Sequence, residues 1–185
     1  MSPESFRDPY LAGLAARIAV VRARTRQLAS DSSPDRMTRR PANGGWSAAE
    51  VFEHMCIANL SYEKAVDRAI ERSCARRDAP RAFRSTLGGG FLIRALEPGS
   101  RNVPTLRPFQ PLAVRPNVAD AFLASMDWVE GRMRAADGLD LRVMLTSPVM
   151  PILRLNLGEA FEVAVVHSER HLNQIERALK EAAAS

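Results

Sequence analysis

The sequence is poor in histidine, cysteine, lysine and aromatic residues. Its 185 residues include three histidines, two cysteines and only 6% aromatic residues, and Lys64 and Lys180 are the sole lysines. Cys56 and Cys74 are 18 residues apart on one expected helix. That spacing separates them by about 27 Å along the helix axis, which excludes a disulfide between them. We therefore expect two buried thiols in a reducing compartment.

Long hydrophobic runs are also missing. No apolar segment approaches the roughly 20 residues that span a bilayer, which argues against a membrane partner. The first ten residues, MSPESFRDPY, lack the basic and then apolar pattern of a secretory signal. The chain is 46% hydrophobic and 25% charged, which is typical of a soluble globular protein. We expect one cytoplasmic domain over residues 1–185.

Basic residues outnumber acidic ones, 26 to 21, and give a formal net charge of +5. Nearly all are arginines, and they are spread along the chain rather than gathered in one block. This spread favours a general bias towards arginine over a nucleic-acid surface, so we expect no nucleic-acid partner. Salt-dependent retention of DNA would reverse that expectation.

Four segments have apolar residues every three or four positions, which predicts a helix in each: 8–29, 47–74, 118–136 and 157–182. Three of them begin with N-capping signals: Asp8 before Pro9, Ser47 with Glu50, and Asn156 with Glu159. Asn117 is the expected N-cap of the remaining helix, 118–136. The clearest stripes are Leu11, Leu14, Ile18, Val21, Thr25 and Leu28 in the first, and Val118, Phe122, Met126, Val129 and Met133 in the third.

The segment 76–116 interrupts this helical pattern. Gly88, Gly89 and Gly90 predict a flexible turn, and the prolines that follow exclude a long regular element. A loop of this length usually covers a site or wraps a core. We predict an all-α protein, an up-down-down-up four-helix bundle with a long irregular connection between the second and third main helices.

The three histidines fall on the expected helices. His167 and His171 are four residues apart on the last helix, so their rings point the same way, one turn apart. Two such imidazoles can hold one divalent ion, and His54 from a facing helix would complete a site with open positions. The alternative is that the three histidines are hydrogen-bonded core residues. Two histidines four residues apart also occur by chance on amphipathic helices.

Other chemistries lack their motifs. A zinc protease needs a glutamate next to the first histidine, but Glu169 lies two residues after His167. A zinc deaminase needs a Pro-Cys-x-x-Cys segment, and Cys56 is a poor ligand beside His54. Phosphate-binding glycine motifs are missing too. No carboxylate is an evident general base, because Glu50 belongs to a helix cap, so the catalytic residues stay unassigned.

Two segments resemble the DinB-like superfamily. They are residues 45–55, GWSAAEVFEHM, and residues 167–175, HSERHLNQI, which contain the three histidines. The resemblance implies a four-helix bundle with a divalent metal, zinc or nickel first, on His54, His167 and His171. It also implies a bacterial enzyme that transfers a low-molecular-weight thiol, as co-substrate, to a small-molecule electrophile, and a homodimer is a further expectation. A metal-dependent hydrolase and a non-catalytic metal-binding or structural bundle stay open.

Overall fold

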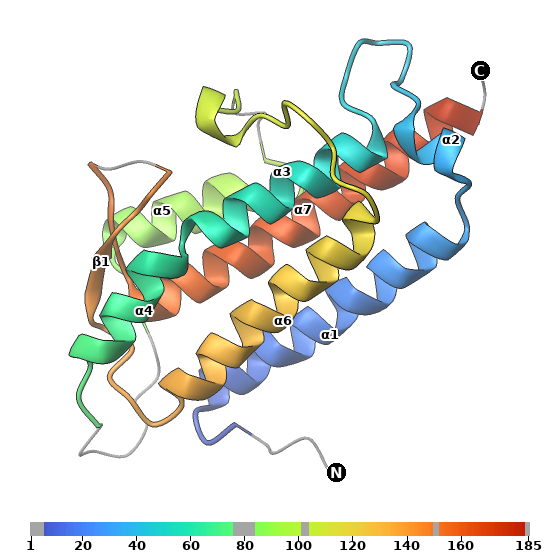
Figure 1. Cartoon of the computed structure of the whole chain (residues 1–185). Helices are drawn as coiled ribbons and strands as arrows, with labels where there is room; N and C mark the ends of the chain where they lie inside the picture. Colours follow the sequence, from blue (N-terminus) through green and yellow to red (C-terminus); the bar gives the residue numbers. More distant parts are fainter. Residues whose placement is uncertain (1–5, 76–83, 101–103, 150–151, 184–185) are drawn as a thin grey trace.

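The structure is a computed structural model, and it describes residues 6–75, 84–100, 104–149 and 152–183. Four long helices lie side by side in it: α1 (Pro9–Ser30), α3 (Ala48–Ser61), α6 (Val118–Ala136) and α7 (Leu157–Ala183) (Figure 1). Helices α1 and α3 each pack against both α6 and α7. The chain is therefore mostly helical, as the sequence predicts.

Shorter elements fill the connections: α2 (Pro34–Thr38), α4 (Glu63–Arg72), α5 (Leu87–Leu96), the 3-10 helix η1 (Arg107–Phe109), and strands β1 (Met144–Thr146) and β2 (Arg154–Asn156). The two strands form an antiparallel pair with Leu145 opposite Leu155. None of the helices that the structure describes has both the length and the apolar character of a membrane span.

The apolar stripes form one core between the long helices. The core includes Leu11, Leu14, Ile18 and Val21 from α1, and Val118, Phe122, Met126, Val129 and Met133 from α6. Burying one large apolar side chain stabilises a fold by about 1.5–3 kcal/mol. The packing of the helices therefore rests largely on this core.

The helix starts follow the capping signals in three of four cases. The side chain of Asp8 accepts from the Tyr10 N–H, and Ser47 and Glu50 form a reciprocal capping box. Asn156 and Glu159 bond each other in the same way at the start of α7. The fourth prediction was wrong: Asn117 precedes α6 with a left-handed backbone, φ 50°, and no side-chain cap. A side-chain cap requires an extended backbone at that position.

The predicted helix over 47–74 is two helices. It breaks at Tyr62, whose buried hydroxyl bonds to Ser147 Oγ at 3.0 Å in the segment after β1. Helix α4 then ends at Arg72, where Ser73 is extended and its hydroxyl donates to the Asp140 carbonyl. Cys74 therefore lies outside the helix and is exposed, which corrects the expectation of two buried thiols; Cys56 is buried.

The glycine-rich segment was also predicted wrongly. Gly88, Gly89 and Gly90 lie in the first turns of α5, which packs against α7. Gly89 is required there, because a Cβ atom at this position would overlap the carboxylate of the fully buried Glu159. At the other end of α5, Arg170 donates to the carbonyls of Ala95 and Glu97.

Candidate metal centre

The structure brings His54, His167 and His171 together between α3 and α7. One ring nitrogen from each lies within 4.8 Å of the others, and the ring centroids are 4.3–5.1 Å apart. His54 comes from the second turn of α3, whose start is fixed by the capping box. His167 and His171 lie one turn apart on α7. His54 is buried, whereas His167 and His171 are partly buried.

Oxygen acceptors orient two of the three rings. The Nδ1–H of His54 donates to the Phe109 carbonyl at 2.7 Å, and the Nδ1–H of His171 donates to Gln174 Oε1 at 2.7 Å. A neutral imidazole that carries its proton on Nδ1 has a free lone pair on Nε2. Both Nε2 atoms are therefore available as ligands. Such oxygen partners on the second nitrogen are the usual surroundings of a metal-binding histidine.

The electrostatics of the cluster favour neutral rings. Burial, followed by the proximity of His171 and His54, lowers the pKa of His167 well below its ordinary value. Burial and then His54 lower the pKa of His171 to about 3. Burial lowers the pKa of His54 too, although the bond to the Phe109 carbonyl opposes that shift. All three imidazoles are therefore uncharged at neutral pH, so a cation meets no competing proton.

The spacing of one pair of nitrogens already fits a bound metal ion, and all three lie within 4.8 Å of one another. The Nε2 atoms of His54 and His167 are 3.2 Å apart. Two nitrogens bound at about 2.0–2.1 Å in tetrahedral geometry are separated by roughly 3.3 Å. Three imidazoles are the donor set of several catalytic zinc sites, which leave the fourth position open. The donor set and its spacing thus suit zinc or a similar ion.

No acid or thiol joins the described cluster. Glu169 points away and binds Arg17 through two hydrogen bonds of 2.9 and 2.6 Å. Glu50 is occupied by Arg40 and by the helix cap. Cys56 is buried, and its burial raises the pKa of the thiol to about 12. The cluster therefore offers neutral nitrogen donors and no general base.

The segment 104–117, which we call the strap, passes over α3 (Figure 1). It supplies the Phe109 carbonyl to His54, and Phe109 itself is buried. Arg115 anchors the strap through hydrogen bonds of 2.8 and 2.6 Å to the carboxylate of Glu53. Burial acts to raise the pKa of Glu53, but the bonds and charge from Arg115 outweigh it and lower that pKa.

Sequence reasoning did not identify Phe109, Glu53 or Arg115 as site residues. Phe109 contributes a backbone carbonyl, which every residue type has, so the sequence carries no signal for it. Glu53 is inside the motif around His54, and its position next to that histidine is the one available hint. Its partner Arg115 is 62 residues further along the chain.

One of the three comparisons with known proteins gives a match. Residues 17–175 match the family model described as the DinB superfamily. This match covers well over half of the chain and includes all three histidines, so the chain belongs to the DinB superfamily. No curated protein and no solved structure gives a match.

Proposed function

We propose that this member of the DinB superfamily is an enzyme that holds a divalent metal ion on His54, His167 and His171. We propose further that it transfers a low-molecular-weight thiol to a small electrophile. The observation that carries the proposal is the convergence of three neutral imidazoles, two of which have Nδ1 bonded to an oxygen acceptor. A core histidine that only satisfies its own hydrogen bonds has no need of two other imidazoles beside it.

The residues of the chain have separable roles in this proposal. Phe109 and Gln174 hold the rings of His54 and His171 with Nε2 towards the shared point. The ring of Trp46 covers one side of His54 at 5.2 Å between centroids. A divalent ion on neutral ligands keeps its full charge and lowers the pKa of a bound thiol or water. Zinc and nickel are the first candidates because imidazole suits both.

The transfer itself balances without a protein base. The thiolate sulfur forms a bond to the electrophilic carbon, and the electron pair of the bond that breaks departs with the leaving group. The thiol proton passes to water, because the histidine cluster contains no carboxylate. A metal-binding bundle without catalysis would also lack a carboxylate in the cluster. If the metal activated water instead of a thiol, the protein would be a hydrolase. The experiment must therefore separate three cases.

The test is a coupled measurement of metal content and product. The protein is loaded with zinc, nickel or manganese and offered bacillithiol, mycothiol or glutathione with model electrophiles. We expect about one metal ion per chain and thiol adduct formation in the wild type, with both lost in His171→Ala. Circular dichroism checks that the variant keeps its helices, since the apolar core rather than the metal holds the fold.

Three outcomes distinguish the candidates. Adduct formation that depends on His171 supports the transferase. Metal binding without any adduct, in every combination, favours the non-catalytic bundle, and hydrolysis of the electrophile without a thiol favours the hydrolase. A wild type that binds no metal ion overturns the proposal as a whole.

We also propose an up-down-down-up order for α1, α3, α6 and α7, within a single domain. The directions in which Figure 1 draws these helices support this order. A cytoplasmic location and a homodimer stay predictions; light scattering of the purified protein tests the second.

A further inference from the structure

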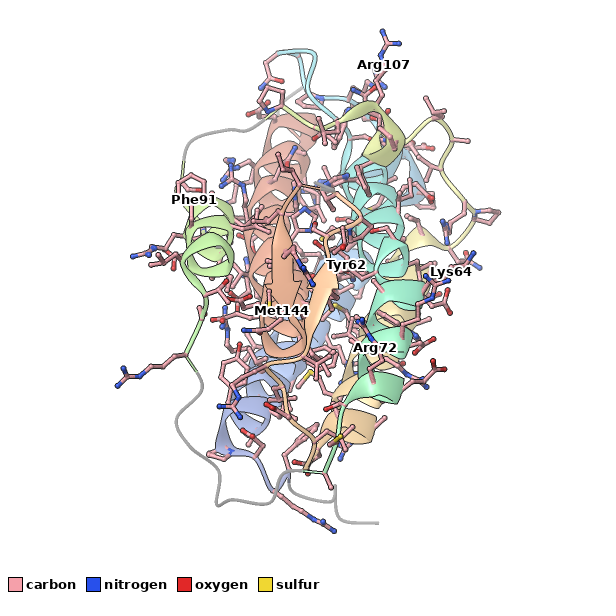
Figure 2. The ribbon with its side chains drawn as sticks, turned by 90° about the vertical axis from the view of Figure 1, so that its left-hand side faces the viewer. Tyr62, Lys64, Arg72, Phe91, Arg107 and Met144 are labelled. Carbon is pink, nitrogen blue, oxygen red and sulfur yellow. The ribbon has the colours of Figure 1, made fainter. Side chains whose placement is uncertain are left out.

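A groove runs between α4 and β1, and none of the three clustered histidines lines it. The volume of this open groove is about 490 Å³, which is within the range of about 300–1,000 Å³ common for small-molecule sites. Figure 2 shows this side of the molecule. Lys64 and Arg72 extend from α4, and Met144 lies on the neighbouring strand β1. His54 is seven residues before Ser61 at the groove, a separation of about 10 Å along α3.

One wall of the groove is strongly basic. Lys64, Arg68 and Arg72 follow one another at intervals of four residues, so they share a face of α4. Glu71 is the one carboxylate of the lining. Neither Lys64 nor Arg68 has an acidic partner among the described residues, and Arg72 donates to the backbone carbonyls of Arg68 and Met144. The wall therefore has positive charge that the described part of the chain does not neutralise.

The opposite wall is the outer edge of β1. Hydrogen bonds from Ser147 N–H to the Leu153 carbonyl and from Leu157 N–H to the Val143 carbonyl fix which residues face β2. Residues alternate along an antiparallel strand, so Met144 and Thr146 direct their backbone groups away from β2. The bond from Arg72 to the Met144 carbonyl, 2.9 Å, shows that this edge faces α4. The Thr146 N–H is thus a donor directed into the groove.

Apart from Ser61, the remaining lining is apolar. Ala65, Leu145 and Pro148 lie among the charged and polar groups. A ligand that suits the groove therefore has an anionic group for the cations and the Thr146 N–H, and an apolar part for these side chains. Charge-assisted bonds to anionic oxygens are about twice as strong as neutral ones, and guanidinium groups match phosphate and carboxylate in geometry.

We infer that the groove between α4 and β1 is a second ligand site, which binds a small organic anion through Lys64, Arg68, Arg72 and the Thr146 N–H. The anionic group is a phosphate or a carboxylate, and it is attached to an apolar body that lies against Ala65 and Pro148. This site is independent of the metal and of the proposed thiol transfer, because none of its residues belongs to the histidine cluster.

Phenyl phosphate is a suitable probe, followed by backbone and arginine side-chain NMR resonances of the full chain with a chelator present. We expect saturable shifts of the Leu145 and Thr146 amides and a Kd of about 1 mM or tighter. Benzoate tests the carboxylate in place of the phosphate. Phenol, which lacks the anionic group, and inorganic phosphate, which lacks the apolar body, should both bind at least several-fold more weakly.

Two matched double variants complete the test. Lys64→Met with Arg68→Gln should weaken phenyl phosphate at least tenfold. Arg26→Gln with Lys180→Met removes the same two charges from exposed positions on α1 and α7, and should leave the Kd within twofold. Lys64 and Arg68 are exposed, so their replacement does not threaten the fold.

The inference is overturned if neither phenyl phosphate nor benzoate gives saturable shifts. It is also overturned if both double variants lose affinity equally, because binding would then follow the net charge of the protein and not the groove. Shifts confined to residues around His54 would also overturn it. None of these results bears on thiol transfer, because no metal or thiol is present in the experiment.

Discussion

Arg115 donates from its peptide N–H, its Nε and its Nη2 to the carboxylate of Glu53, the residue immediately before His54. The pair holds the strap against α3. Arg115 is six residues after Phe109, whose carbonyl orients His54. The side chain of Glu53 is 6% exposed, so it is a nearly buried carboxylate whose charge is balanced by one guanidinium. A contact outside the cluster thus anchors the segment whose carbonyl accepts from His54.

Replacing Glu53 with glutamine should loosen the strap and weaken metal binding. Hydrogen-bond partners of metal ligands typically contribute 10–100-fold in affinity. Glu53 acts on such a partner, the Phe109 carbonyl, only through the strap, so we expect a loss at the low end of that range, roughly tenfold. Competition with a chromophoric chelator measures it. Glu63→Gln is the control, because it removes the same charge from an exposed position on α4. If the two variants bind metal equally well, the strap does not position His54.

The same pair predicts a pH dependence of stability. The folded protein has a lowered Glu53 pKa, so the pair stabilises it above the ordinary value of about 4.3 and loses that contribution as the pH falls through the folded value. The free energy of unfolding of the wild type should exceed that of Glu53→Gln at pH 7, and the difference should shrink below about pH 4.3. Denaturant titrations at a series of pH values measure it. A constant difference would contradict the assignment.

Gly89 and Gly90 should respond oppositely to alanine. A Cβ at Gly89 overlaps the Glu159 carboxylate, which also accepts from the Asn156 N–H at 2.8 Å and cannot easily move. We expect Gly89→Ala to lower the free energy of unfolding by about 1–3 kcal/mol. At Gly90 the nearest atom is Ser85 Cβ at 3.5 Å, an ordinary contact, so Gly90→Ala should be neutral or stabilise by up to about 1 kcal/mol. Equal effects would mean that α5 tolerates the overlap.

The two cysteines should differ strongly in reactivity. Cys74 is exposed, while Cys56 is buried with its pKa raised to about 12, so little thiolate forms at neutral pH. Iodoacetamide should modify about one thiol per native chain, and peptide mass analysis should place it at Cys74. In Cys74→Ser the rapid modification should disappear. Rapid labelling of Cys56 would contradict this prediction and show that α3 opens readily.

Interactions between residues close in sequence were readable from the sequence itself. The stripe from Val118 to Met133 defines a buried helix because its period matches the helical turn. The caps Ser47–Glu50 and Asn156–Glu159 join residues three apart, and His167 and His171 share a face because they are four apart. Those short-range relations predicted the helices that became α1, α6 and α7 and, with the family motifs, singled out the three histidines as candidate ligands.

The tertiary structure decided what depends on partners far along the chain. Tyr62 breaks the second helix while its hydroxyl bonds to Ser147, 85 residues away, and Gly89 is helical beside the buried Glu159. His54 is oriented by the carbonyl of Phe109, 55 residues away, a group whose chemistry is the same in every residue type. Local periodicity carries no information about such pairs, because their energies arise only once folding has placed the two segments side by side.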